Sequence, residues 1–165
     1  MLTGSGVALV TLVALEPVMA LVHRFVFNGP LWCWHESHHE HPTARRIVRN
    51  DLLWLWPLLG SAALISLGGP GLAGIGVGIV GYVAAYILAH DGVAHGRFWV
   101  PMFVRRMSGF RLLAQTHHLH HRGGRHGGAP PFAVYAAPVE HTWHVSKNFV
   151  PATKPCPPGR VRVAG

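Results

Sequence analysis

Histidine is the residue type whose number and spacing could do chemistry in this sequence. The chain has 165 residues, and 14 of them are histidines. The pattern HxxHH occurs twice, and because residues i, i+3 and i+4 share one face of a helix, each copy presents three imidazoles in one direction. Neutral imidazole binds iron, zinc, copper and nickel, so the pattern predicts a metal site. The two copies are His35, His38 and His39, and His117, His120 and His121.

Two further pairs of potential ligands are spaced five residues apart. They are His23 with Asn28, and His90 with His95. Such residues point about 140° apart on a regular α-helix, so we expect them to converge only across a helix end. One metal takes about four protein ligands, so nine or ten ligands indicate two metals. The predicted ligands are His23, His35, His38, His39, His90, His95, His117, His120 and His121, with Asn28 as a further candidate.

Carboxylates near the histidines could hold a ligand ring through its second nitrogen. Asp91 follows His90 directly, and Glu36 and Asp51 lie close to other motifs. Glu16 lies within an apolar stretch, where a carboxylate indicates a functional role. We predict Asp91 and Glu16 beside the ligands. An all-nitrogen site next to a membrane suits O₂ activation better than hydrolysis, although zinc could also fill a dinuclear site.

The remaining histidines fit no repeated pattern. His118 lies between predicted ligands and is expected to point away from the ligand face. The HxxH of His141 and His144 stands apart from the other motifs, and its role stays open. The full set is His41, His118, His126, His141 and His144.

Composition and hydropathy place these motifs in a membrane protein. Half of the residues are hydrophobic and only 12% are charged, against about 25% in soluble domains. Apolar stretches at 6–22, 52–67 and 71–89 are about 24–29 Å long as helices, close to the ~30 Å hydrocarbon core. The sequence therefore predicts an all-α integral membrane bundle with about three transmembrane helices, and it argues against a nucleic-acid partner despite the net charge of +8.

The arginines give an orientation. They follow the first and third apolar stretches, whereas the turn 68–70 between the second and third carries no charge. The positive-inside rule then places the N-terminus and this turn outside. All four histidine motifs are then expected to lie together on the cytoplasmic face of the membrane.

Several other segments have two interpretations. Gly74 and Gly78 have the small-xxx-small spacing of close helix packing, or they reflect membrane-helix composition. The aromatics Trp32, Trp34, Trp54, Trp56, Phe25 and Phe27 could line a substrate path or form an interfacial belt. The arginines Arg97, Arg105, Arg106 and Arg111 could dock an acidic protein or bind lipid headgroups.

The last part of the chain is expected to differ from the spans. The pattern over residues 100–119 predicts an interfacial amphipathic helix or a short re-entrant one, which Gly123 and Gly124 would end. We predict one domain over residues 1–150 and a disordered tail over 151–165.

Four stretches resemble the bacterial β-carotene hydroxylases of the fatty acid hydroxylase/sterol desaturase superfamily. They are ALVHRFVFNGPLWCWHESHHE, NDLLWLWPLL, YILAHDGVAHGRF and LLAQTHHLHHRGG, in the order typical of that family. The resemblance spans about residues 7–138. It implies a non-haem di-iron monooxygenase, with the nine histidines as iron ligands, O₂ as co-substrate and electrons from ferredoxin and its reductase. The implied substrate is a carotenoid, hydroxylated at C3 of the β-ionone ring to give cryptoxanthin and then zeaxanthin.

The chain departs from the family pattern at two places. Asn28 stands where the family has a histidine, and GGAPPFAVYAAP follows the last motif in place of a Cys-Val-Ser-Phe-Gly-Phe-like run. Other functions therefore stay open. They are another di-iron lipid hydroxylase or desaturase, a carotenoid ketolase, a homologue inactivated at Asn28, and a non-enzymatic membrane metal-binding protein.

Overall fold

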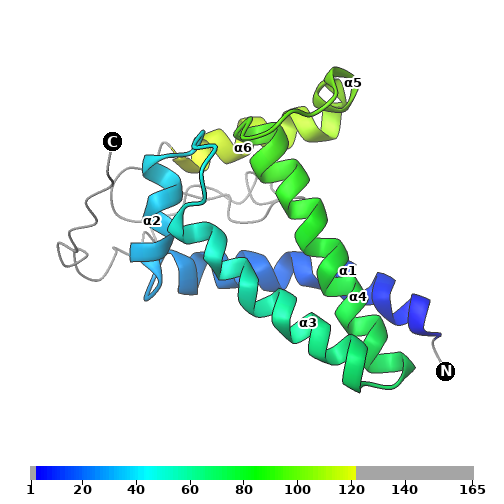
Figure 1. Cartoon of the computed structure of the whole chain (residues 1–165). Helices are drawn as coiled ribbons and strands as arrows, with labels where there is room; N and C mark the ends of the chain where they lie inside the picture. The colour runs from blue at the N-terminus through cyan, green and yellow to red at the C-terminus, as the bar shows by residue number, and fades with distance from the viewer. Residues whose placement is uncertain (1–2, 122–165) are drawn as a thin grey trace.

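The computed structural model describes residues 3–121, and over this range the chain forms helices and no strand (Figure 1). The predicted all-α fold class is confirmed. Several predictions lie outside the described residues: the stop at Gly123 and Gly124, the histidines 126, 141 and 144, the segment 127–138 and the tail 151–165. The division into residues 1–150 and a tail therefore stays a prediction.

Three long segments form the body of the protein. The first is α1 (Gly4–Val22), which continues into the π-helical turn η1 (His23–Phe27). The second is the 3₁₀ segment η2 (Arg49–Trp54) followed by α3 (Leu55–Leu67). The third is α4 (Pro70–Tyr86), which continues into the π-helical segment η3 (Ile87–Ala94).

Each of these segments is long and apolar enough to cross a membrane, as the sequence predicts. They comprise 24, 19 and 25 residues. Each segment is longer than the apolar stretch predicted from the sequence, because a 3₁₀ or π segment adds polar residues at one end. The N-terminus and the turn between α3 and α4 lie at one end of the molecule (Figure 1). The histidine-bearing helices lie at the other.

Three shorter helices complete the histidine-bearing end. They are α2 (Trp32–Glu40), α5 (Met102–Arg106) and α6 (Ser108–His121). The single amphipathic helix predicted over 100–119 is thus two helices, interrupted at Met107, whose backbone is extended at φ −59° and ψ 133°. Leu113 of α6 joins Trp54, Tyr82 and Tyr86 in the buried core, so α6 is packed onto the spans.

Glycines let α4 pack closely between the two other spans. A Cβ added at Gly78 would lie 2.6 Å from the carbonyl oxygen of Ala8 in α1. One added at Gly74 would lie 2.5 Å from the carbonyl oxygen of Gly4, and one at Gly76 would lie 2.8 Å from that of Ser61 in α3. The small-xxx-small pair is therefore a contact surface for α1 and not only a feature of composition.

We predict that Gly78→Ala destabilises the protein, since its new methyl group must push α1 away from α4. Overpacking of this kind costs about 1–3 kcal/mol. Gly71→Ala is the matched control in the same helix, because a Cβ there meets nothing within 4 Å. Thermal unfolding in detergent should show a lower midpoint for Gly78→Ala only; equal midpoints for the two variants would contradict the packing role.

Candidate metal centre

Two π-helical turns bring together the residues that are spaced five apart. The backbone N–H of His95 donates to the carbonyl of His90 at 3.0 Å, and that of Asn28 donates to the carbonyl of His23 at 3.0 Å. The sequence predicts convergence across a helix end; the structure instead widens each helix by i→i+5 hydrogen bonds. The rings of His90 and His95 lie 4.8 Å apart as a result. π turns of this kind are frequent at functional sites.

The predicted histidines gather into two buried groups, each able to hold one metal ion. The His38 group consists of His38, His90, His95 and His117, from α2, η3, the residue after η3, and α6. The His23 group consists of His23, His35 and His120, from η1, α2 and α6. Within each group the ligand atoms lie within 4.8 Å of one another. Both HxxHH motifs contribute to both groups, which places the groups side by side.

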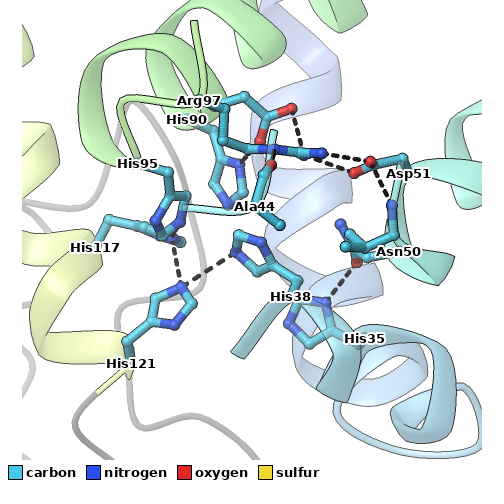
Figure 2. Close-up of polar contacts among 12 residues, drawn as sticks. His35, His38, Ala44, Asn50, Asp51, His90, His95, Arg97, His117 and His121 are labelled. Carbon is cyan, nitrogen blue, oxygen red and sulfur yellow. Dashed lines mark hydrogen bonds and ion pairs between the residues drawn. The ribbon is translucent and has the colours of Figure 1, made fainter. Parts of the chain in front are cut away.

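His39 and His121 connect the two groups. Their rings stack with centroids 4.2 Å apart. Nε2 of His39 lies 3.1 Å from Nε2 of His35, and Nε2 of His121 lies 3.1 Å from Nε2 of His38. With these two side chains, all nine predicted histidines converge on one region; the rings on the His38 side point toward one another in Figure 2.

The nitrogen spacing fits metal ions. Nε2 of His95 lies 2.7 Å from Nε2 of His117, and Nε2 of His23 lies 2.9 Å from Nε2 of His35. Two nitrogens bound at right angles to one metal, each about 2.0–2.1 Å from it, would lie roughly 2.9 Å apart. Nε2 of His90 is buried and has no hydrogen-bond partner within the part of the chain that the structure describes. A cation would satisfy these converging nitrogens.

Hydrogen bonds at the far ring nitrogens direct the Nε2 lone pairs inward. Nδ1 of His35 donates to Oδ1 of Asn50 at 2.8 Å, and Nδ1 of His90 donates to Oδ1 of Asp91 at 2.7 Å. With the proton held on Nδ1, Nε2 is the free ligand atom. Asp91 thus lies where the sequence predicts a supporting carboxylate.

Burial keeps the imidazoles neutral and able to bind metal. Loss of solvent lowers the pKa of His35, His95 and His121 from 6.5 to about 3. Burial also lowers the pKa of His38, His39 and His117 below the ordinary value. Neighbouring histidines add to this effect, because each would repel a second positive charge. Protons therefore do not compete for these nitrogens near neutral pH.

Other predicted site residues belong to neither metal group. Glu16 faces α4, where its Oε2 accepts a hydrogen bond from the Tyr82 hydroxyl at 2.8 Å. Asn28 is buried, and its Nδ2 donates to the His23 carbonyl at 3.1 Å, which supports the π turn. Metal ligation by Asn28 stays a prediction. His41 and His118 are exposed, and His118 belongs to neither metal group, although its ring centroid lies 6.2 Å from that of His95.

The structure separates the aromatic residues into two sets. Trp34, Trp56 and Phe25 are exposed, as an interfacial belt requires. Trp32 and Trp54 are buried. Trp32 packs beside His39 with ring centroids 5.2 Å apart, and Phe27 lies 5.7 Å from His35. The exposed residues thus fit the belt, whereas a role of the buried ones in a substrate path stays a prediction.

Two contributors to the site were missed or misassigned from the sequence. Asn50 is 4% exposed and holds His35; a polar residue at the histidine end of a span was its only signal. Arg97 was expected on a docking or headgroup surface, which is wrong, because its guanidinium pairs with Asp51 and Asp91. Arg105 likewise donates to the carbonyl of Gly92 at 2.9 Å.

Comparison with known proteins points to one family. The chain is 36% identical over 141 residues to a β-carotene hydroxylase from Paracoccus sp. (strain PC1), covering 81% of this chain and 85% of that protein. It is 34% identical over 137 residues to that of Pantoea ananas, covering 81% and 77%. The match to chloroplastic β-carotene hydroxylase 1 of Capsicum annuum is 34% over 125 residues, covering 72% of this chain and 38% of that protein. No family model matches the chain, and no solved structure matches it.

The fold and the site define an all-helical membrane protein with two histidine groups that could hold metal ions. The relatives identify it further. The chain belongs to the β-carotene hydroxylase family, which confirms the resemblance of its motifs.

We predict that His117→Ala lowers bound metal from about two ions to about one per chain, because it removes a ligand of the His38 group alone. His118→Ala, the neighbouring exposed histidine of α6, is the matched control and should keep both ions. Metal analysis of the purified variants checks this. Equal metal content in the two variants would contradict the assignment of His117.

Proposed function

We propose that this chain is a carotenoid hydroxylase whose nine histidines hold two non-haem irons. The proposed reaction is O₂-dependent hydroxylation at C3 of the β-ionone ring, which converts β-carotene to cryptoxanthin and then to zeaxanthin. The observation that carries this proposal is the pair of buried, all-imidazole groups at one end of three membrane-length helices, in a chain of the β-carotene hydroxylase family.

The iron pair would supply the oxidant that cleaves an unactivated C–H bond, with O₂ as co-substrate and two electrons delivered by ferredoxin, which its reductase reduces. The residues of the chain have other tasks. The two groups supply neutral imidazole ligands, and Asn50 and Asp91 fix the orientation of His35 and His90. The buried position of these rings keeps water away from the reacting atoms.

An apolar cavity beside the metal groups supports a lipid-soluble substrate. It has a volume of about 230 Å³ and is lined by residues of α1, η1, η2, α3 and α4, among them Met19, Phe27, Trp54 and Ile79. Phe27 also packs beside His35, with ring centroids 5.7 Å apart. Trp54 contacts Tyr86 at 4.5 Å, and Tyr86 stacks on His90 at 4.4 Å. The cavity wall is thus continuous with both histidine groups.

The proposed orientation places the histidine end on the cytoplasmic side of the bacterial inner membrane. Exposed arginines decorate that end, as the positive-inside rule requires. The part of the chain that the structure describes presents Arg45, Arg46, Arg49, Arg106 and Arg111 there. These side chains would suit anionic headgroups or an acidic ferredoxin. Arg97 does not belong to this set, because its guanidinium pairs with Asp51 and Asp91.

We predict that a β-carotene-producing host expressing this chain accumulates cryptoxanthin and zeaxanthin, whereas the host alone does not. Pigment chromatography and mass spectrometry measure this. A keto product would indicate a ketolase, and the absence of any new carotenoid would refute the proposed substrate. If the chain were inactive and Asn28→His restored activity, it would be a degenerate homologue. Purified protein with zinc or copper in place of iron would favour a metal-binding function.

We predict that Ile79→Trp reduces hydroxylation while leaving the metal content unchanged, because the larger ring fills the cavity without touching a ligand. Ala63→Trp is the matched control, since Ala63 lines a different apolar depression near the turn between α3 and α4. The measurements are pigment yield and iron content of both variants. Equal pigment yields would show that the substrate does not use this cavity.

A further inference from the structure

Arg97 lies at the centre of a polar network that reaches a histidine of each group (Figure 2). Its side chain is only 11% exposed. The guanidinium forms a fork with Asp51, in which Nη1 donates to Oδ1 at 2.7 Å and Nη2 donates to Oδ2 at 2.6 Å. Nη1 also lies 3.3 Å from Oδ2 of Asp91. Two backbone carbonyls complete its contacts, those of Ala44 at 2.8 Å and Arg46 at 3.1 Å.

One branch of the network leads to the His38 group. Asp91 uses one carboxylate oxygen for Nδ1 of His90 and presents the other to Arg97. The backbone brings Arg97 to this position: Gly96 adopts a φ of +64°, and the N–H of Arg97 donates to the carbonyl of Asp91 at 2.9 Å. A positive φ favours glycine, so the turn after η3 is built to fold Arg97 back onto Asp91.

The other branch leads to the His23 group. Oδ2 of Asp51 accepts a hydrogen bond from the backbone N–H of Val48 at 3.0 Å and so fixes the start of η2. Asn50 precedes Asp51 in that turn. Its side chain holds His35, and its backbone N–H donates to the Ser37 hydroxyl at 3.1 Å. Arg97 therefore reaches His35 through Asp51 and Asn50.

We propose that Arg97 is a positioning residue that couples the two metal subsites: one guanidinium fixes His90 through Asp91 and His35 through Asp51 and Asn50, and thereby sets the two histidine groups relative to each other. This inference rests on the proposed pair of metals. A guanidinium suits the role because its planar fork fixes a carboxylate in one orientation. A lysine keeps the charge but lacks the fork.

The test is a titration of metal-free protein with cobalt(II), followed by visible absorption, which reports each bound ion by its ligand-field bands. Arg97→Lys should weaken binding at both subsites, by about 10–100-fold each, as loss of a partner outside the ligands typically does. Asp91→Asn should weaken only the His38 group, and Asn50→Ala only the His23 group. Arg105→Gln is the matched control, because Arg105 contacts the same segment through the Gly92 carbonyl and should leave both subsites unchanged.

The outcomes separate this inference from the proposed function. Wild-type protein that binds no pair of metal ions refutes the proposed function itself. If the wild-type protein binds a pair of metal ions but Arg97→Lys binds them unchanged, the coupling role alone is overturned. The same holds if Arg97→Lys weakens metal binding at one subsite only. An Arg105→Gln variant as weak as Arg97→Lys also overturns it, since the effect would then be a general loosening of the segment. If Arg97→Lys does not fold, Asp51→Asn breaks the same fork and must weaken both subsites.

Discussion

The structure depends on a cluster of buried imidazoles whose ring nitrogens face one another. Nε2 of His90 has no hydrogen-bond partner in the described part of the chain, and a buried polar atom without a partner is costly. Burial also lowers the pKa of His35 and His95 to about 3, so these imidazoles stay unprotonated near neutral pH. Metal ions are the species that can satisfy several such lone pairs at once. The segments η1, α2, η3 and α6 contribute rings, and η2 holds the ring of His35 through Asn50.

The π turns explain how membrane helices can serve this cluster. A helix that crosses a bilayer must satisfy its backbone hydrogen bonds internally. By switching from i→i+4 to i→i+5 bonding, η1 and η3 keep those bonds, and η3 still turns His90 and His95 toward the same point. A loop at the same place could also orient these side chains, but it would expose unpaired backbone groups close to the hydrocarbon.

The sequence predicted the parts of the site that depend on local periodicity. Both HxxHH motifs, the three spans and the supporting role of Asp91 follow from spacing and composition. The π turns did not follow, because five-residue spacing is equally compatible with a helix end. Arg97 was misassigned for a different reason: the positive-inside rule counts arginines but does not distinguish a lipid-facing side chain from one paired with carboxylates. Its partner Asp51 is 46 residues away in the chain, and only the fold brings them together.

The histidines have an apolar side and a polar side, and each side would serve a different part of the proposed reaction. On the membrane side, Phe27, Trp54 and Tyr86 form an apolar wall that a substrate dissolved in lipid could reach without entering water. On the side of the connecting segments, Arg97, Asp51 and Asn50 form a polar shell that fixes the rings. A site inside the bilayer would lack such a shell, and one in a soluble domain would lack the apolar approach. The position at the helix ends is where both can be built around the same imidazoles.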